Sequence, residues 1–169
     1  MEMPQLTPTP VSSLTETLAS KLLEKKLLLA TAESCTGGGI ATALTDLAGS
    51  SAWFDAGFVT YSNEAKQCML NVPSVLFVEG GPGAVSEETV RAMTAGAIEN
   101  SAASVAVAVS GVAGPGGGSE TKPVGTVWIG WQWGEVQRVQ LFQFPGDRAA
   151  VREATVHAAI SGLVKLLAE

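Results

Sequence analysis

The stretch LLLATAESCTGGGIATAL, residues 27–44, decides the fold that this sequence predicts. Its first four residues form an apolar run typical of a buried strand, and residues 40–44 indicate the opening of a helix. The polar residues between them therefore form a strand-to-helix turn. Three consecutive glycines, starting at Gly37, let the backbone approach a ligand closely, and the first amides of the helix point outward at its positive end.

A hydroxyl beside such a turn has oxyanion donors close at hand, and Ser34 supplies that hydroxyl. The alternative is a tight turn whose glycines serve only packing, and the pattern leaves both interpretations open because a lone glycine turn is a weak signal. Cys35 is a rival nucleophile. An inert buried thiol is the favoured interpretation for it, because no neighbour in the sequence activates it.

Composition bounds the class of protein. The chain has 169 residues, a length typical of one domain, and 46% of them are hydrophobic, so a sizeable core is expected. The net charge of −6 argues against a broad phosphate-backbone footprint, and nucleic acid is not an expected partner. Two cysteines give neither a disulfide framework nor metal-ligand spacing, so a reduced, cytoplasmic location is the simplest context. No apolar run is long enough to span a membrane, and no secretory signal is recognisable.

The first part of the chain is predicted to form a flexible tail over residues 1–11, followed by one domain over residues 12–169. Ser12 or Ser13 is expected to cap a helix that ends at Lys25-Lys26, where the basic side chains face the negative helix end.

After the glycine turn, the sequence alternates helical and strand patterns. We expect a helix from Thr36 to Ala48-Gly49, a strand within residues 52–61, and a short helix over residues 64–70 capped by Asn63. The remaining predicted segments, in order, are an irregular loop at 71–85, a helix capped by Ser86 and running to Asn100, a central strand at 105–109, a glycine-rich loop at 110–123, an antiparallel hairpin at 124–133 and 136–144, and a last helix at 148–167. This order predicts a three-layer α/β/α single domain with a mixed, mostly parallel sheet.

The hairpin carries three tryptophans, Trp128, Trp131 and Trp133. We expect them to pack in the core or at an oligomer interface rather than to stack on a cofactor.

The single histidine restricts the chemistry. His157 lies inside the last predicted helix among apolar residues, where a structural role is more common than a catalytic one. A Ser-His-Asp or Cys-His triad would have to use it, and a metal site with several histidine ligands is impossible. A hydrolase would therefore need another base, and lysine serves when its pKa is lowered.

Lys66 is the candidate base. It falls in the first turn of the helix predicted after Asn63, where the positive helix end disfavours a second positive charge and lowers the lysine pKa. Tyr61 ends the preceding strand, and its phenol can relay a proton, so that Ser34 completes a Ser/Tyr/Lys set. By spacing alone, a solvated lysine and a strand-end tyrosine with a wet hydroxyl are the more common outcomes.

The second glycine-rich loop, residues 110–119, follows a strand but lacks the Gly-Lys-Ser/Thr ending of a P-loop. It can still offer backbone amides to an anion, or it is only a flexible connection. Arg148, at the start of the last helix, suits a phosphate or a surface carboxylate equally well.

Five motifs together resemble the CinA C-terminal domain family, the nicotinamide mononucleotide (NMN) deamidases. They are AESCTGG at 32–38, YSNEAK at 61–66, GVAGPGG at 111–117, KPVGTV at 122–127 and FPGDR at 144–148. The resemblance implies a three-layer α/β/α fold, assembly into homodimers or larger homo-oligomers, and no metal or organic cofactor. The reaction it implies is hydrolysis of the carboxamide of NMN to nicotinic acid mononucleotide and ammonia.

Carried over residue by residue, the resemblance makes Ser34 the nucleophile, with Tyr61 and Lys66 as its proton-transfer partners. The positions that match the family's pocket are Thr36, Gly37, Gly38, Ser110, Gly111, Ala113, Gly114, Gly116 and Arg148. The chain departs from the family pattern at residues 75–83, which are slightly longer than the usual acidic stretch, and at Gly39, where a larger apolar residue is common.

The mechanism expected from this set has neutral Lys66 withdrawing the Ser34 proton through a bridging Tyr61. One glycine loop would hold the oxyanion, and the other loop with Arg148 would hold the phosphate. Two alternatives remain, a non-catalytic nucleotide-binding or regulatory module linked to competence or DNA damage, and an amidase acting on a different small amide.

Overall fold

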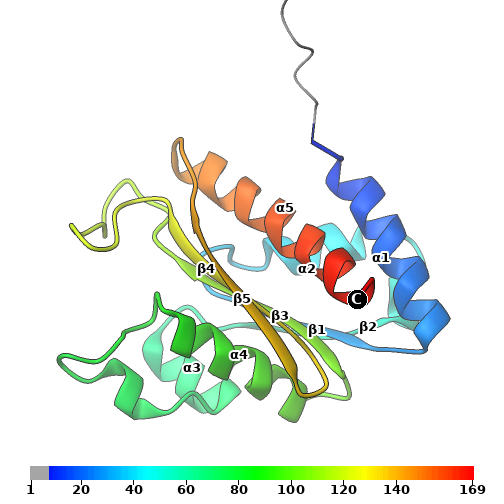
Figure 1. Ribbon diagram of the computed structural model, residues 1–169, viewed down its shortest axis with the longest axis horizontal. Coiled ribbons are helices and arrows are strands. Elements are labelled where there is room, and N and C mark those ends of the chain that lie inside the picture. The colour runs from blue at the N-terminus through cyan, green and yellow to red at the C-terminus, as the bar shows by residue number, and fades with distance from the viewer. Residues whose placement is uncertain (1–7) are drawn as a thin grey trace, which may run out of the picture.

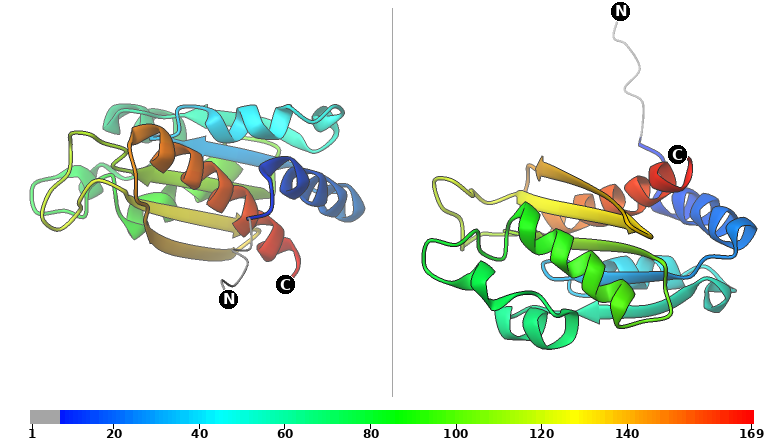
Figure 2. Two further views of the ribbon diagram at one scale, coloured as in Figure 1. Left: turned by 90° about the horizontal axis from the view of Figure 1, so that it is seen from above. Right: turned by 60° about the horizontal axis from the view of Figure 1, so that its bottom comes forward.

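The computed structural model describes residues 8–169 and has three layers (Figure 1). In chain order its elements are α1 (Val11–Lys25), β1 (Leu29–Glu33), α2 (Gly39–Thr45), a 3-10 turn η1 (Ser50–Ala52), β2 (Phe54–Val59), α3 (Asn63–Leu70), a 3-10 turn η2 (Ser74–Phe77), α4 (Glu87–Glu99), β3 (Val105–Gly111), β4 (Thr126–Trp133), β5 (Val136–Gln143) and α5 (Arg148–Leu167). Helices α1, α2 and α5 cover one face of the sheet, and α3 and α4 cover the other, as both views in Figure 2 show. The predicted α/β/α architecture is confirmed.

The sheet has five strands in the order β2-β1-β3-β4-β5. Strand β1 pairs in parallel with both β2 and β3, whereas β4 is antiparallel to β3 and to β5. Only β4 therefore runs against the other strands, and the prediction of a mixed, mostly parallel sheet is confirmed. Because β1, β2 and β3 run the same way, the segments that follow them leave from one edge of the sheet.

The central strand β3 is apolar from Val105 to Val109 because both of its faces are buried there. Its valines, Val105, Val107 and Val109, face a core cluster shared with α1, α2 and α5. The alanines between them, Ala106 and Ala108, face the cluster shared with α4. Small side chains on this second face allow close packing, so α4 lies directly on the strands that carry the site.

Helix α1 begins at Val11, within the predicted tail, and residues 1–7 of that tail lie outside the described residues. The prediction that Ser12 or Ser13 caps this helix is wrong. Pro10 occupies the N-cap position without a side-chain hydrogen bond, because its fixed φ leads directly into the helix.

Strand β1 starts later than the apolar run 27–30 predicted. Lys26 ends α1 in a left-handed conformation with φ 57°, and the amide of Leu27 bonds back to the carbonyl of Leu22. Leu27 thus belongs to the helix terminus, and the strand runs from Leu29 to Glu33, directly up to the glycine turn.

Helix α2 is shorter than predicted. Gly37 and Gly38 have φ of 57° and 103°, so the backbone is still in the turn there and the helix cannot begin at Thr36. It starts at Gly39 and ends at Thr45.

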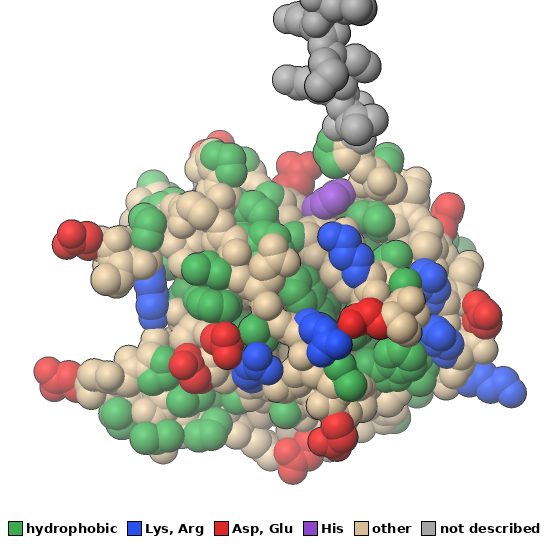
Figure 3. Space-filling view, in the orientation of Figure 1, with side chains coloured by type: hydrophobic (Ala, Val, Ile, Leu, Met, Phe, Trp, Pro, Cys, Tyr) green, Lys and Arg blue, Asp and Glu red, His purple; other side chains and the backbone are tan. Residues whose placement is uncertain are grey.

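The tryptophans pack in the core. Trp131 is buried and its indole Nε1 donates to the carbonyl of Ala159 on α5 at 2.8 Å, while Trp133 and Trp128 pack against the two core clusters. Within residues 8–169, no helix combines the length and the apolarity needed to cross a membrane. On the face in Figure 3, basic side chains are interspersed with acidic ones and form no continuous basic stripe.

Candidate active site

Ser34 and Lys66 meet although 32 residues separate them in the chain. Ser34 directly follows β1, and Lys66 lies on α3, which follows the neighbouring parallel strand β2. The Nζ of Lys66 donates to the Oγ of Ser34 at 3.0 Å and to the carbonyl oxygen of Thr60 at 2.7 Å. A hydroxyl and an amine thus stand within proton-transfer distance at the edge of the sheet.

Helix α3 holds Lys66 in place. Its N-cap is Ser62, whose Oγ accepts from the amide of Ala65 at 3.0 Å, so the prediction that Asn63 is the cap is wrong by one residue. Ser62 has the extended backbone that an N-cap needs, whereas Asn63 is already the first helical residue.

The amine of Lys66 is buried, with only 1% of the residue exposed. Burial lowers its pKa from 10.5 to about 8, and the neighbouring Cys35 opposes this only in part. No carboxylate within residues 8–169 forms an ion pair with it. The sequence predicted that the positive end of the helix would lower the pKa of Lys66; in the structure, the main cause is desolvation by burial. At pH 7 about a tenth of the amine is neutral, compared with about 0.03% at the ordinary pKa.

Cys35 is also buried, and burial raises the pKa of its thiol to about 11. The thiol stays protonated near neutrality, which agrees with the interpretation of Cys35 as an inert neighbour of the serine.

Tyr61 lines the same cavity but does not lie between Ser34 and Lys66. Its ring is exposed, and its hydroxyl accepts a hydrogen bond from Nη2 of Arg148 at 3.0 Å. The bridging role expected for Tyr61 is corrected by this geometry, because Lys66 reaches Ser34 directly. A phenol at the cavity mouth can still contact a substrate.

Glu33 is a residue of the site that the sequence reasoning missed. It is fully buried at the end of β1, where its Oε1 accepts from the Thr36 hydroxyl and from the amide of Ile40 at 2.8 Å, and its Oε2 accepts from the amide of Ala41 at 3.0 Å. Gly38, the N-cap of α2, has no side chain for this purpose, so the carboxylate takes over the capping. The sequence signal that could have predicted this role is a carboxylate, Glu33, shortly before the start of a helix.

The turn itself offers oxyanion donors. Within residues 8–169, the amides of Cys35 and Thr36 donate to no acceptor on another residue, and both residues follow Ser34 within two positions of the chain. Gly37, by contrast, donates its amide to the carbonyl of Ser34. Of these two residues, Cys35 lines the cavity with Ser34, so its amide is the candidate oxyanion donor of the first glycine turn.

Arg152 on α5 is a second residue that the sequence reasoning missed, and it binds the backbone carbonyls of this turn. Its Nε donates to the carbonyl of Cys35 and its Nη2 to the carbonyl of Thr36, both at 3.1 Å. These contacts join residues 117 and 116 positions apart, and no local pattern predicts them.

A cavity of about 200 Å³ opens over the pair. The residues that line it are Ser34, Cys35, Tyr61, Lys66, Ala84, Val85, Ser110, Gly111, Ala113 and Arg148. Of the predicted pocket residues, Ser110, Gly111, Ala113 and Arg148 are brought together there. Gly111 has to be small, because a Cβ would lie 2.6 Å from a methyl group of Val127.

The other predicted pocket residues lie behind or beside the cavity. Thr36, Gly37 and Gly38 build the turn rather than line the space. Gly114 contributes its carbonyl, which accepts from Nη1 of Arg148 at 2.8 Å. Gly116 does not line this cavity, nor does it line a second cavity beside it that Ala113, Arg148 and Arg152 border.

The irregular segment 71–85 contributes Ala84 and Val85 to the wall. Lys122, in the second glycine-rich loop, donates its Nζ to the carbonyl of Pro82 at 2.6 Å. The two long loops that project from the same end of the sheet in Figure 1 are thus joined across the site.

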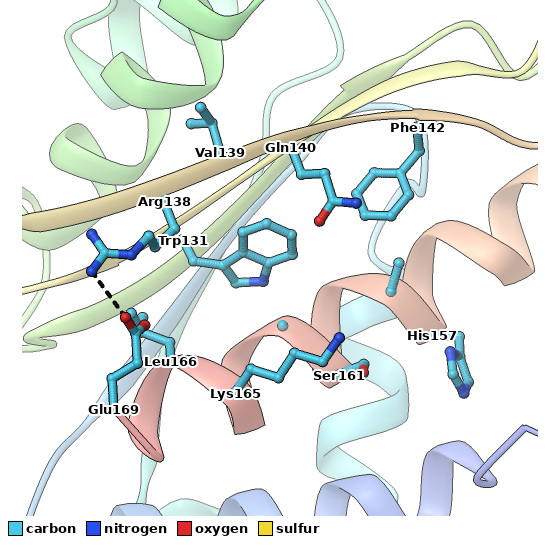
Figure 4. Close-up of a pocket in the computed structure, with 12 residues that line it drawn as sticks. Trp131, Arg138, Val139, Gln140, Phe142, His157, Ser161, Lys165, Leu166 and Glu169 are labelled. Atoms are coloured by element: carbon cyan, nitrogen blue, oxygen red, sulfur yellow. Dashed lines mark hydrogen bonds and ion pairs between the residues drawn. The ribbon is translucent and has the colours of Figure 1, made fainter.

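A different cavity, of about 430 Å³, lies between the hairpin and α5 (Figure 4). Ser161 and Lys165 both line it, but no hydrogen bond joins them, and Lys165 is exposed. His157 also lies there, and its Nε2 is 2.8 Å from the carbonyl oxygen of Thr9, consistent with a structural role. Of these two cavities, only the Ser34 cavity pairs a serine with a buried amine. Within the described part of the chain, no cluster of side chains suits a metal ion.

Known proteins match this chain over most of its length. The family model described as CinA C-terminal domain matches residues 11–167. A Pseudomonas putida protein named nicotinamide-nucleotide amidohydrolase PncC is 55% identical over 157 residues, which cover 93% of this chain and 97% of that protein. The Escherichia coli (strain K12) protein of the same name is 46% identical over 155 residues, covering 90% of this chain and 93% of that protein.

Solved structures agree with this relationship. The structure titled competence/damage inducible protein CihA from Agrobacterium tumefaciens is 41% identical, with a TM-score of 0.88 and coverage of 98% of this chain and 99% of that chain. The sequence motifs, the fold and these matches lead to one conclusion: the chain belongs to the CinA C-terminal domain family.

Proposed function

We propose that this protein is an amidohydrolase that converts NMN to nicotinic acid mononucleotide and ammonia. The observation that carries the proposal is the 3.0 Å contact between the buried Lys66 amine and the Ser34 hydroxyl. The names of the Pseudomonas putida and Escherichia coli relatives support the substrate.

In the first half of the reaction, neutral Lys66 accepts the Ser34 proton while Oγ attacks the carboxamide carbon. The amide of Cys35, a residue that lines the cavity, stabilises the oxyanion, an effect worth about 3 kcal/mol per donor. The ammonium form of Lys66 returns the proton to the departing nitrogen. Ammonia leaves, and the acyl group remains as an ester on Ser34.

In the second half, the same amine, neutral again, accepts a proton from water. The hydroxide attacks the ester carbon, and the serine leaves as its hydroxyl after receiving the proton from Lys66. Tyr61, held by Arg148 at the mouth of the cavity, is placed to contact the substrate rather than to carry the first proton. No metal or organic cofactor takes part in these steps.

Incubation with NMN followed by mass analysis tests the reaction directly, because amide-to-acid conversion adds about one mass unit. We expect Ser34→Ala and Lys66→Ala each to lower turnover by at least ~10³-fold while circular dichroism shows an intact fold. Near-normal ammonia release from purified Ser34→Ala protein would remove the serine from the mechanism. Tight NMN binding without any ammonia release from the unmodified protein would favour a non-catalytic nucleotide-binding or regulatory module.

The same assay decides the substrate. A panel of small amides, compared at equal concentration, should show the highest kcat/KM for NMN. Faster hydrolysis of an unrelated amide would instead indicate an amidase that uses the same serine and lysine.

We also propose that the protein acts in the cytoplasm as a homodimer or larger homo-oligomer. The edge strand β5 leaves Val136 and Leu141 about half exposed, which suits an interface. Size-exclusion chromatography with light scattering measures the mass of the assembly directly, and a monomer at micromolar concentration would contradict the proposed oligomer.

A further inference from the structure

We propose that the cavity adjoining the Ser34 cavity is the subsite for the substrate's phosphate, with Arg152 as its principal ligand. The inference rests on the proposed function, because it places the far end of the same nucleotide. It gives Arg152 a second role besides holding the carbonyls of the nucleophile turn.

The Ser34 cavity is small for a nucleotide. The Ser34 cavity holds about 200 Å³, less than the roughly 300 Å³ at the lower limit of pockets for drug-sized ligands. It suits a carboxamide-bearing ring but not a whole nucleotide. A neighbouring cavity of about 660 Å³ shares Ala113 and Arg148 with it, so the two spaces adjoin at these residues. A substrate with its amide at Ser34 thus extends past Arg148 into the larger space.

The charges in this larger cavity favour an anion. Arg148 and Arg152 stand one helical turn apart at the start of α5, and both line it. Neither guanidinium forms an ion pair with a carboxylate within residues 8–169, although the chain carries a net charge of −6. Both guanidinium groups at this cavity are therefore available to bind a negative group.

Arg152 is the better placed of the two. Arg148 donates Nη1 to the carbonyl of Gly114 and Nη2 to the hydroxyl of Tyr61. Arg152 uses Nε and Nη2 on the nucleophile turn, which fixes the plane of its guanidinium, and its Nη1 has no acceptor in the described chain. A fixed guanidinium with an open donor binds an anion without further loss of side-chain freedom.

The backbone adds to this field. The amides of Arg148 and Ala149 open the 20-residue helix α5 and have no acceptor within residues 8–169. Asp147 is the one acidic residue lining the cavity, and its carboxylate accepts from the amide of Ala150 as the N-cap. Two guanidinium groups and a positive helix end outweigh this single carboxylate.

The experiment compares NMN with nicotinamide riboside, which presents the same carboxamide and ribose without the phosphate. The quantity measured is the ratio of kcat/KM for NMN to that for the riboside. A loss caused by a loosened nucleophile turn affects both substrates alike and cancels in this ratio. We expect Arg152→Gln to lower the ratio about 10- to 100-fold, mostly through KM for NMN, and Arg152→Lys to lower it less. Arg138→Gln, in the separate cavity of Figure 4, is the matched control and should leave the ratio unchanged.

Calorimetry separates this inference from the proposed function. In a Ser34→Ala background, NMN should bind more tightly than the riboside, and Arg152→Gln should remove most of that difference. A ratio and a binding difference that both survive Arg152→Gln within about twofold would overturn the phosphate subsite, even if NMN is hydrolysed. If the unmodified protein hydrolyses neither compound, the proposed function fails, and the calorimetric difference still decides whether Arg152 binds the phosphate.

Discussion

The pH dependence of the first chemical step provides the strictest test of Lys66 as the base. Its amine must be neutral to accept the serine proton, and burial sets its pKa at about 8. The neutral fraction then rises from about 9% at pH 7 to about 91% at pH 9. We expect the rate of acylation by NMN to rise about tenfold over this interval and to level off above it.

Single-turnover measurement of ammonia release is the appropriate assay, because it isolates the chemical step from product release. The range begins at pH 7, since a phosphate monoester titrates near pH 6 and would distort the profile below that. Lys165→Met, which removes an exposed lysine from the other cavity, should keep the tenfold rise. Any residual activity of Lys66→Met should lack it. A flat profile between pH 7 and pH 9 in the unmodified protein would refute Lys66 as the base.

The same pKa makes a prediction about stability. A pKa of about 8 in place of 10.5 means that the folded state disfavours the charged amine by about 3 kcal/mol. The unfolded chain binds the proton more tightly between pH 8 and pH 10.5, so this residue's contribution to the free energy of unfolding increases with pH across that window and is lowest below pH 8. Denaturant titrations of the unmodified protein and Lys66→Met should converge as the pH rises through this window. Parallel curves would contradict the stated cause of the lowered pKa.

Two further predictions concern the residues that support the pair. Glu33→Gln should destabilise the fold by about 2–3 kcal/mol and lower turnover, because the amide cannot accept all three hydrogen bonds that the buried carboxylate receives; urea titration against Glu16→Gln, an exposed carboxylate on α1, measures this, and equal stability of the two variants would be the contrary result. Gly96→Ala should destabilise by at least about 2 kcal/mol, because its Cβ would lie 1.8 Å from the carbonyl oxygen of Leu70, whereas Gly116→Ala, with open space around it, should change little; a melting temperature kept by Gly96→Ala would show that α3 and α4 separate easily.

The local part of the fold was predictable from the sequence. Ser86 caps α4 as the pattern indicated, α5 covers the predicted residues 148–167, the apolar run at Val105–Val109 is the central strand, and the hairpin turns where expected. Each of these features depends on residues that are close together in the chain. The errors in the early helices are also local. The Schellman ending of α1 at Leu27 and the left-handed Gly37 and Gly38 before α2 shift the element boundaries by a few residues.

The site was predictable where it depends on neighbouring parallel strands. Residues that follow β1 and β2 emerge at one edge, so a turn after one strand and a helix after the other bring Ser34 and Lys66 together. The orientation of side chains was not predictable in the same way. The phenol of Tyr61 turns to Arg148, a partner 87 residues away, and the guanidinium of Arg152 reaches back 117 residues to the turn. Such contacts depend on how α5 lies across the sheet, and no spacing rule contains that information.

Because burial makes Lys66 reactive, catalysis depends on how α3 and α4 pack on their face of the sheet. A positive helix end would have lowered the pKa of an exposed amine only slightly, and its effect would weaken with salt. Burial lowers it much further and is insensitive to salt, but it requires α3, which carries Lys66, to stay packed on the fold, and α4 contacts α3 at Leu70. Gly96 makes that contact possible, because its hydrogen faces the backbone of Leu70, one turn beyond Lys66 on α3. A variant that pushes α3 outward should therefore raise the pKa of the amine toward 10.5 and slow the first proton transfer at pH 7, even though it changes no residue that touches the substrate.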